Sequence, residues 1–250
     1  MPVAIITGAA QGIGRRTAEL FAAAGYSLAL LDLKPCPPIP SGQILTFTGD
    51  LTDETFVASS IASAHEHFGR LDVLVNNAGI SNIAPAETID TGAFRRVLEV
   101  NLVAPFVISR IVGAVMLQQR QGSIVNIASI AGLTGVADRS AYNASKHGLI
   151  GLTRTLAAEW GGRGVRVNAV CPGWVKTEMD HVDQARGTYT DSDITDRIPM
   201  ARFATPDDIA RAALFLADST QSPFINGHTL TVDGGWTADG SWQSLRLSHR

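Results

Sequence analysis

The sequence has few charged side chains and no strong excess of either sign. Aspartate, glutamate, lysine and arginine make up 17 % of the 250 residues, and the formal net charge is −3. Proteins that bind nucleic acids usually carry a basic patch, so we expect no nucleic-acid partner. The scattered basic residues also argue against a membrane-surface site. With 45 % hydrophobic residues, the chain can instead bury a large core.

Signals for export, membrane insertion and metal binding are also missing. The opening MPVAIITGAA lacks the charged start and the apolar stretch of a signal peptide. No uninterrupted apolar run approaches the roughly 18 residues of a membrane-spanning helix. Cys36 and Cys171 are therefore expected to be reduced thiols in a cytoplasmic protein. The six histidines are scattered, so no metal site is expected.

Strand-like and helix-like segments alternate along the whole chain, without a repeat or a linker. The expected strands are VAIIT from Val3, SLALLDL from Ser27, ILTF from Ile44, LDVLV from Leu71, SIVNIA from Ser123, VRVNAV from Val165 and HTLTVDG from His228. The expected helices span about 11–25, 53–69, 91–119, 140–160 and 205–217. Most strand runs are continuously apolar, which is typical of strands covered on both faces. We predict one α/β domain over 1–250, with a doubly wound parallel sheet that binds ligands at the carboxyl ends of its strands.

Residues that favour helix ends lie at several of these boundaries. Gly25 is expected to stop the first helix, and Thr52 to cap the second. Thr205 is expected to cap the last helix, with Pro206 as its first residue.

A glycine-rich turn follows the first expected strand. The segment TGAAQGIG, residues 7–14, places glycines at positions 8, 12 and 14. Glycine allows a tight turn and a close approach of the backbone to a pyrophosphate, and the next helix offers free N–H groups and a positive dipole end. An ordinary glycine-rich loop is the alternative, but the position after the first strand favours dinucleotide binding.

Asp32 ends the second expected strand, where dinucleotide-binding folds place an acid against the ribose hydroxyls. A carboxylate at this position repels a 2′-phosphate. Leu33 follows it, and Gln11 in the glycine turn adds no positive charge. We therefore expect NAD rather than NADP, although Lys34 weakens the distinction.

These and further motifs together resemble the short-chain dehydrogenase/reductase family over essentially the whole chain. In family order they are TGAAQGIG at 7–14, Asp32, GDL at 49–51, NNAG at 76–79, Asn101, Ser129, YNASK at 142–146 and CPGWVKT at 171–177. The resemblance implies a Rossmann fold and an oxidoreductase that moves a hydride between nicotinamide and a secondary alcohol or ketone.

The resemblance also implies a role for each matching position. The catalytic residues would be Asn101, Ser129, Tyr142 and Lys146. The cofactor would contact Gly8, Gln11, Gly12, Ile13, Gly14, Asp32, Asp50, Leu51, Asn77, Ala78, Gly79, Tyr142, Lys146, Pro172, Gly173, Val175 and Thr177. The substrate would contact Ser129, Trp174, Ile80, Leu133 and Met179. Asn76 would steady the strand that carries NNAG.

The spacing of Tyr142 and Lys146 fits this chemistry. Four residues apart on a helix, the two side chains share one face. Tyrosine has a pKa of about 10 and is a poor base near neutral pH. A nearby ammonium group and the oxidised nicotinamide would favour its phenolate. Ser129 would then bind the substrate oxygen, and Asn101 would hold a water that links Lys146 to solvent.

Substrate, partner and assembly are expectations of a coarser kind. The segment 177–202 is expected to be a solvated lid over the substrate, and the tail from Trp236 is expected either to cover the pocket, to cross to a neighbouring subunit or to hang free. The family implies a small-molecule substrate and a homotetramer, with 91–119 and 140–160 as contact surfaces.

Three functions are compatible with these residues. The leading one is an NAD-dependent dehydrogenase of a sugar, polyol or small hydroxy compound. The alternative is a 3-oxoacyl-acyl-carrier-protein reductase using NADPH, for which Arg120 and Arg163 could meet an acidic carrier. A redox sensor that binds a dinucleotide without catalysis is the third, although it would not need an activated tyrosine.

Overall fold

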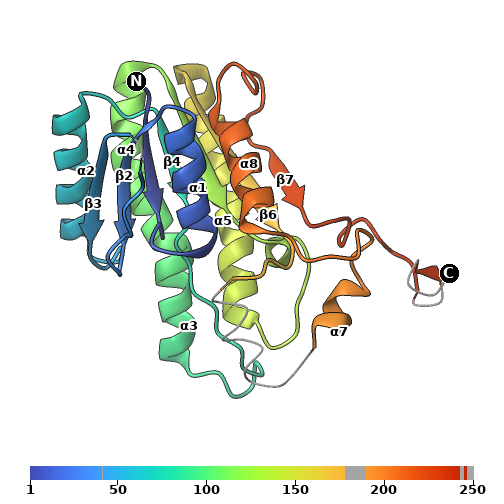
Figure 1. Cartoon of the computed structure of the whole chain (residues 1–250). Helices are drawn as coiled ribbons and strands as arrows, with labels where there is room; N and C mark the ends of the chain where they lie inside the picture. The colour runs from blue at the N-terminus through green and yellow to red at the C-terminus, as the bar shows by residue number, and fades with distance from the viewer. Residues whose placement is uncertain (41, 178–189, 243–244, 247–250) are drawn as a thin grey trace.

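One parallel sheet organises the computed structural model, which describes residues 1–40, 42–177, 190–242 and 245–246 (Figure 1). The sheet order is β3-β2-β1-β4-β5-β6-β7, and every neighbouring pair is parallel. The strands are β1 Val3–Thr7, β2 Ser27–Asp32, β3 Ile44–Thr48, β4 Val73–Asn76, β5 Gly122–Ile127, β6 Val165–Pro172 and β7 Thr229–Val232. This order confirms the predicted doubly wound Rossmann fold.

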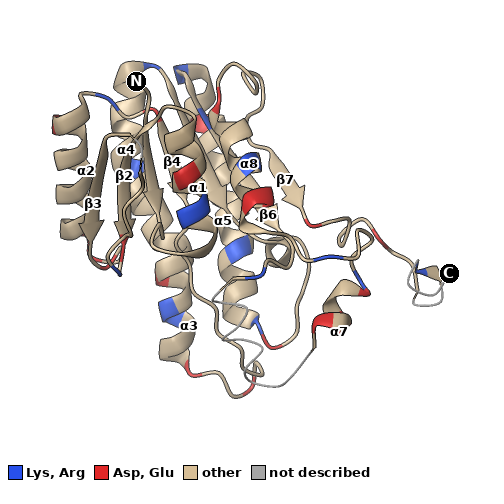
Figure 2. Ribbon diagram, viewed as in Figure 1, with Lys and Arg blue, Asp and Glu red and all other residues tan. Residues whose placement is uncertain are grey.

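Helices cover both faces of the sheet (Figure 1). The α-helices are α1 Gly12–Ala23, α2 Glu54–Phe68, α3 Thr91–Leu98, α4 Ala104–Gln119, α5 Ser140–Trp160, α7 Asp191–Thr195 and α8 Pro206–Ala217. Short turns are η1 Glu99–Val103, η2 Ile130–Gly132 and η3 Gly161–Arg163. Helices α1 and α8 pack on one face, and α2, α4 and α5 on the other. Charges of both signs are interspersed over these helices and their loops (Figure 2).

Alternation within β1 shows why its sequence is apolar throughout. Val3 and Ile5 join the core beneath α2, α4 and α5, whereas Ala4 and Ile6 join the core beneath α1 and α8. Because successive side chains point to opposite faces, a strand covered on both sides needs apolar residues at every position.

The cap of α2 differs from the prediction. Asp53, and not Thr52, is its N-cap, and the Asp53 Oδ1 accepts hydrogen bonds from the backbone N–H groups of Thr55 and Phe56 at 2.9 and 3.2 Å. A carboxylate suits this position because it also interacts favourably with the helix dipole. The other two predicted ends are confirmed: Gly25 follows α1 with φ +86°, and Thr205 caps α8 in a capping box with Pro206 first.

The expected helix over 91–119 is interrupted by a π-helical turn at η1. Pro105 lies at the start of α4 and has no N–H to donate to the carbonyl of Asn101 four residues earlier. Instead, Ala104 donates its N–H to the carbonyl of Glu99, five residues back. Such π turns recur at functional sites, and this one contains Asn101.

The same stretch is long and apolar enough to be a candidate membrane span. Its mean hydropathy reaches 2.0 in the best window, and 56 % of that window is buried inside the protein. Core helices of globular proteins satisfy the same criteria, so length and composition are weak evidence here. Ser109 and Arg110 divide this stretch, so it holds no uninterrupted apolar run of 18 residues.

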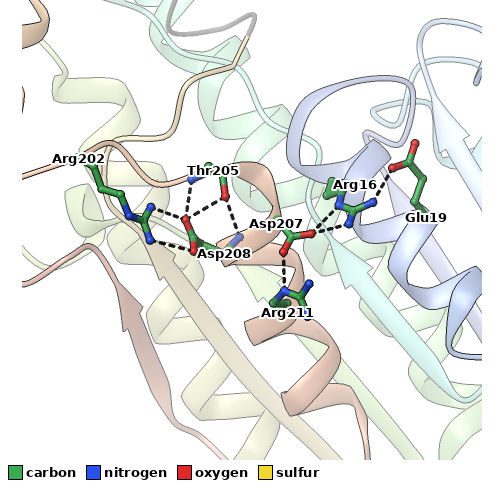
Figure 3. Close-up of polar contacts among 7 residues, drawn as sticks. All are labelled: Arg16, Glu19, Arg202, Thr205, Asp207, Asp208 and Arg211. Atoms are coloured by element: carbon green, nitrogen blue, oxygen red, sulfur yellow. Dashed lines mark hydrogen bonds and ion pairs between the residues drawn. The ribbon is translucent and has the colours of Figure 1, made fainter. Parts of the chain in front are cut away.

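An ionic network joins α1 to α8 (Figure 3). Asp207 accepts hydrogen bonds from Arg16 of α1, at 2.7 Å to Nε, and from Arg211 one turn later on α8. Beside it, Asp208 binds the guanidinium of Arg202 at 2.8 and 3.2 Å. The network fixes the first helix, whose N-terminus faces the site described below.

Candidate active site

A cleft opens at the carboxyl ends of the strands, where the strand order reverses between β1 and β4. It brings together most of the predicted site residues from distant parts of the chain. Those that line it are Gly8, Gln11, Gly12, Ile13, Asp32, Asp50, Leu51, Asn77, Ala78, Gly79, Ile80, Ser129, Tyr142, Lys146, Pro172, Gly173, Trp174, Val175 and Thr177. Open α/β sheets bind ligands at this switch point.

The glycine turn lies close against the NNAG segment. Gly8 has a φ of +66°, and a Cβ on it would lie 2.8 Å from the Cα of Ala78. The Asn77 side chain donates to the carbonyl oxygens of Thr7 and Gly8, at 2.9 and 3.1 Å. Helix α1 has no side-chain cap and no acidic residue in its first turn. Its N–H groups and dipole are therefore available to an anion, which fits a dinucleotide pyrophosphate.

Gly14 is not among the residues that line the cleft, so its predicted contact with the cofactor stays a prediction. A Cβ at this position would lie 2.0 Å from the carbonyl oxygen of Gly8 and 2.4 Å from the Asn77 amide nitrogen. The residue is therefore a packing glycine: it lets the first turn of α1 approach the preceding loop.

Asp32 is fixed at the end of β2 by two backbone N–H groups. Its carboxylate accepts from Ala10 in the glycine turn and from Lys34, each at 2.9 Å. The Lys34 ammonium lies 3.3 Å from the Gln11 amide oxygen. The positive charge of Lys34, which weakens the distinction between NAD and NADP, is therefore held beside the glycine turn. The acid and the lysine both face the space that a ribose would occupy.

Asp50 contacts Arg96, which sequence reasoning missed. The Asp50 carboxylate accepts from Thr52 N–H at 2.9 Å and from the Arg96 guanidinium at 2.8 Å. These contacts hold the pKa of Asp50 below its usual range, and the hydrogen bond from Thr52 N–H has the largest effect. Arg96 also lines the cleft, from α3. No motif marks it, because it meets Asp50 only through the tertiary fold.

Tyr142 and Lys146 lie one turn apart on α5, as predicted. The Lys146 ammonium is 5.5 Å from the centre of the Tyr142 ring and donates to the Ile127 carbonyl at 2.8 Å. Burial lowers the pKa of Lys146 from 10.5 to about 8. A Cβ on Gly79 would lie 3.6 Å from Lys146 Nζ, which is an ordinary contact, and 3.2 Å from Asn101 Oδ1, which is tight, so this glycine makes room for Asn101. At neutral pH the lysine is still a cation beside the phenol.

Asn101 is buried behind the cleft and does not line it. Its amide oxygen accepts from Ile80 N–H at 2.9 Å, and its amide nitrogen donates to the Ile80 carbonyl at 2.9 Å and to Ser145 Oγ at 3.1 Å. The side-chain donors are therefore used in joining the π turn to the loop after NNAG and to α5. The expected water between Lys146 and solvent is not tested by these contacts and stays a prediction.

Ser129 lies two residues after β5 and lines the same cleft as Tyr142. Its hydroxyl oxygen accepts from Ala131 N–H at 3.1 Å, which caps η2 and orients the side chain. The hydroxyl proton is thus left to be donated to an oxygen in the cleft.

A buried chain of polar groups supports the strand before NNAG. The Asn76 amide donates to Ser109 Oγ at 3.0 Å and to Asn126 Oδ1 at 2.8 Å, and the Asn126 amide donates to Thr153 Oγ1 at 2.9 Å. The chain ties β4 to β5, α4 and α5, as expected for Asn76.

The substrate side of the cleft is partly as predicted. Trp174 and Ile80 line it, Leu133 does not, and Met179 lies outside the described residues. Arg139, just before α5, lines the cleft and was missed. Its guanidinium lies 5.7 Å from the centre of the Trp174 ring.

The lid prediction can be followed only in part. Of its acidic residues, Asp180 and Asp183 lie outside the described ranges. Asp191 pairs with Lys176 at 2.6 Å, and Asp193 closes the capping box of α7. These two carboxylates therefore have structural partners in the lid or directly beside it.

Metal-binding and thiol chemistry find little support in the described residues. They contain no group of three or more histidine, cysteine or acidic side chains placed to hold a metal ion. Burial raises the pKa of both Cys36 and Cys171 to about 11, so both are thiols at neutral pH.

Comparison with known proteins covers nearly the whole chain. A family model described as enoyl-(acyl carrier protein) reductase matches residues 8–237. D-threitol dehydrogenase of Mycolicibacterium smegmatis is 40 % identical over 245 residues, which cover 94 % of this chain and 92 % of that protein. The 3-oxoacyl-[acyl-carrier-protein] reductase of Thermotoga maritima is 37 % identical over 244 residues, with 93 % and 96 % covered.

The fold comparison agrees. A solved structure of a candidate NAD(P) dependent gluconate 5-dehydrogenase from Beutenbergia cavernae, with NADP bound at low occupancy, matches with a TM-score of 0.87 and 40 % identity. The match covers 95 % of this chain and 97 % of that one.

Proposed function

The chain belongs to the short-chain dehydrogenase/reductase family, and we propose that it interconverts a secondary alcohol and its ketone in a polyol or sugar-derived hydroxy compound. Membership makes it an oxidoreductase that acts on CH–OH donors with NAD or NADP. One observation carries the proposal: Ser129, Tyr142 and Lys146 line the same cleft as the glycine turn and Asp32.

Tyr142 is the proposed general base. In alcohol oxidation its phenolate takes the hydroxyl proton, while the bound nicotinamide supplies the hydride acceptor. Lys146 favours the phenolate through its charge, and the Ile127 carbonyl holds that charge in place. Ser129 donates its hydroxyl proton to the substrate oxygen and stabilises developing charge there.

Asn101 is the proposed positioning residue. It fixes the Ile80 backbone and Ser145, which in turn donates to the Tyr142 carbonyl at 2.7 Å. Because the side-chain amide of Asn101 is engaged, we propose that its backbone carbonyl oxygen binds the water between Lys146 and solvent. Pro105, four residues later, has no N–H to donate to that carbonyl.

For the cofactor we propose a preference for NAD. Asp32 presents a carboxylate, fixed by two N–H groups, at the end of β2. A 2′-phosphate there would meet like charge, with Lys34 as the nearby compensating cation. The Beutenbergia protein was solved with NADP, so the preference must be measured on this chain.

The carrier-protein alternative is supported by the Thermotoga relative and by the description of the matching family model. Arg120 caps the C-terminus of α4, and Arg163 lies in η3. Both precede β5 and β6, so they lie at the opposite edge of the sheet from the cleft at the carboxyl ends of those strands. A carrier bound to them would be remote from the same chain's Tyr142. This geometry favours a free small-molecule substrate.

For assembly we propose a homotetramer, as the family resemblance implies, in the cytoplasm. Val103 and Phe106 support a contact surface on the long helical stretch, because both are exposed apolar side chains. Light scattering of the purified protein would test the tetramer, and Phe106→Glu should dissociate it.

The test of the proposed function is nicotinamide absorbance with a panel of polyols, sugars, sugar acids, secondary alcohols, their ketones and an acetoacetyl thioester. Each compound is tested with NAD(H) and NADP(H), for the wild type and Tyr142→Phe. We expect turnover of a hydroxylated compound that the variant loses. Turnover of the thioester alone would favour the carrier-protein alternative. Cofactor binding without any turnover would favour the sensor.

A further inference from the structure

A second cavity lies beside the cleft and shares walls with it. Trp174, Ile130 and Val136 line both spaces, so the two cavities adjoin at these residues. The second cavity has a volume of about 390 Å³, which is within the range of small-molecule sites. Its outer wall comes from Arg197, two residues after α7, and from Trp236, Thr237 and Asp239 in the segment after β7.

The segment after β7 is held rigidly by Asp233. This buried carboxylate accepts from Gly235 N–H at 2.9 Å, and from the N–H and hydroxyl of Thr237 at 2.8 and 2.6 Å. The turn places the ring of Trp236 with its centre 6.0 Å from that of Trp174. The cavity therefore has a wall of two indoles, against which the C–H groups of a carbon chain can pack.

The charges in this cavity are Arg197 and Asp239. Asp239 already has partners: it accepts from Ser241 N–H at 2.9 Å and lies 3.7 Å from Arg246 Nε. The Arg197 guanidinium lies 4.6 Å from the centre of the Trp236 ring. It makes no hydrogen bond and no ion pair within 4 Å to any residue in the described part of the chain. Its donors are therefore not engaged in hydrogen bonds there, although its charge, after the Ser241 contacts and Arg246, helps to lower the pKa of Asp239.

We propose that this second cavity binds the carboxylate end of a hydroxylated acid, with Arg197 as its anchor and the reacting alcohol at Tyr142. A planar guanidinium matches a carboxylate in two parallel hydrogen bonds. The hydroxyls of Thr134 and Thr237, which line the same cavity, suit the hydroxyl groups of the chain. This inference rests on the proposed function and narrows it, from polyols and sugar derivatives in general to sugar acids.

The test compares an acid with its neutral analogue. Rates are measured for gluconate and for glucitol, which have six carbons each, in the wild type, Arg197→Met and Arg197→Lys. We expect the wild type to prefer gluconate. Arg197→Met should lower kcat/KM for gluconate by at least about tenfold, mainly through KM, and less than about threefold for glucitol. Arg197→Lys keeps the positive charge but loses the planar guanidinium with its paired N–H donors. Its kcat/KM for gluconate should lie between those of the wild type and Arg197→Met.

Arg95→Met provides a matched control, because Arg95 is an exposed arginine on α3 that lines neither cavity. It should leave both rates unchanged. A second readout is independent of turnover: quenching of tryptophan fluorescence by gluconate in the Tyr142→Phe protein loaded with NAD. The double variant Tyr142→Phe/Arg197→Met should bind gluconate more weakly than Tyr142→Phe, by a factor similar to the loss in kcat/KM.

The possible failures are distinguishable. Wild-type preference for glucitol, or an equal loss for both compounds in Arg197→Met, would overturn the inference and leave the proposed function standing. Tyr142-dependent turnover of other alcohols, with no gluconate binding, would do the same. If no hydroxylated compound were turned over at all, both the proposed function and this inference would fall.

Discussion

Lys146 holds its ammonium 5.5 Å from the ring of Tyr142 while it is almost fully buried, at 4 % exposed. No carboxylate pairs with that ammonium among the described residues, and its hydrogen bond is to the Ile127 carbonyl. Burying the Lys146 ammonium, whose charge would activate the Tyr142 phenol, therefore lowers the free energy of unfolding. This relationship leads to the first prediction.

Lys146→Met should abolish turnover and yet stabilise the protein at pH 7. Burial lowers the pKa of Lys146 from 10.5 to about 8, so the folded state holds the charge less readily than the unfolded chain. Its contribution to stability is least favourable below pH 8 and improves as the pH rises toward 10.5, by about 3 kcal/mol in all. Thermal unfolding should show the variant more stable than the wild type at pH 7, with the difference shrinking between pH 8 and 10.

Lys34→Met is the control for this measurement, because Lys34 is exposed. It should show no such change with pH. If Lys146→Met were less stable than the wild type by a constant amount from pH 7 to 10, the ammonium would be well accommodated and the argument from burial would be wrong.

Replacing Asp32 should change the choice of cofactor. Its carboxylate is fixed by Ala10 and Lys34 N–H groups at the end of β2. In Asp32→Ser we expect kcat/KM for NADP to rise relative to NAD by at least about tenfold, because like-charge repulsion of the 2′-phosphate is removed. Steady-state rates with both cofactors measure this. A wild type that already prefers NADP would refute the assignment, and Lys34→Ala would then show whether that lysine is responsible.

Gly14→Ala should destabilise the protein even without cofactor. An added Cβ would lie 2.0 Å from the Gly8 carbonyl oxygen, and backbone atoms cannot yield cheaply. We expect a loss of about 3 kcal/mol in urea unfolding of the cofactor-free protein. Gly162→Ala, where a Cβ meets no atom within 4 Å, should be nearly neutral. A normal stability with weakened cofactor affinity would instead return Gly14 to the binding role predicted from the sequence.

Asp208→Asn tests the contact between α8 and Arg202. The Arg202 guanidinium, helped by Thr205, lowers the pKa of Asp208 to about 2. The partners are partly exposed to solvent, so we expect a loss of only about 1 kcal/mol at pH 7. The folded pKa is below that of the unfolded chain, so this stabilisation is lost as the pH falls from about 4 toward 2. Chemical unfolding measured from pH 7 to 3 should show the free energies of unfolding of the wild type and Asp208→Asn converging. The control Asp196→Asn should match the wild type at every pH.

The parts of the site that the sequence predicts are those carried by local pattern. Tyr142 and Lys146 lie on one helix, and a spacing of four residues already places them on one face. Asp32 is the last residue of β2, and the glycine turn directly follows β1. Continuous apolar runs identify the covered strands, because burial on both faces leaves no polar position.

What the sequence does not predict depends on contacts between distant segments. Arg96 meets Asp50 and Arg139 meets Trp174 only after the sheet has formed. Nothing in the sequence of this segment indicates that Asp233 holds Trp236 beside Trp174. Asn101 was predicted as a site residue, but its contacts with Ile80 and Ser145 were not, because they join segments that are distant in the sequence.

The sheet order also bears on how the protein is made. Strands β3, β2, β1 and β4 are neighbours and are all encoded within the first 76 residues, together with Asp32 and the glycine turn. They can pair while the rest of the chain is still being synthesised. Until β5 arrives, however, β4 presents a bare apolar edge that another nascent chain could extend. The step most exposed to aggregation is therefore the joining of β4 to β5, which is also where Asn76 finds Asn126.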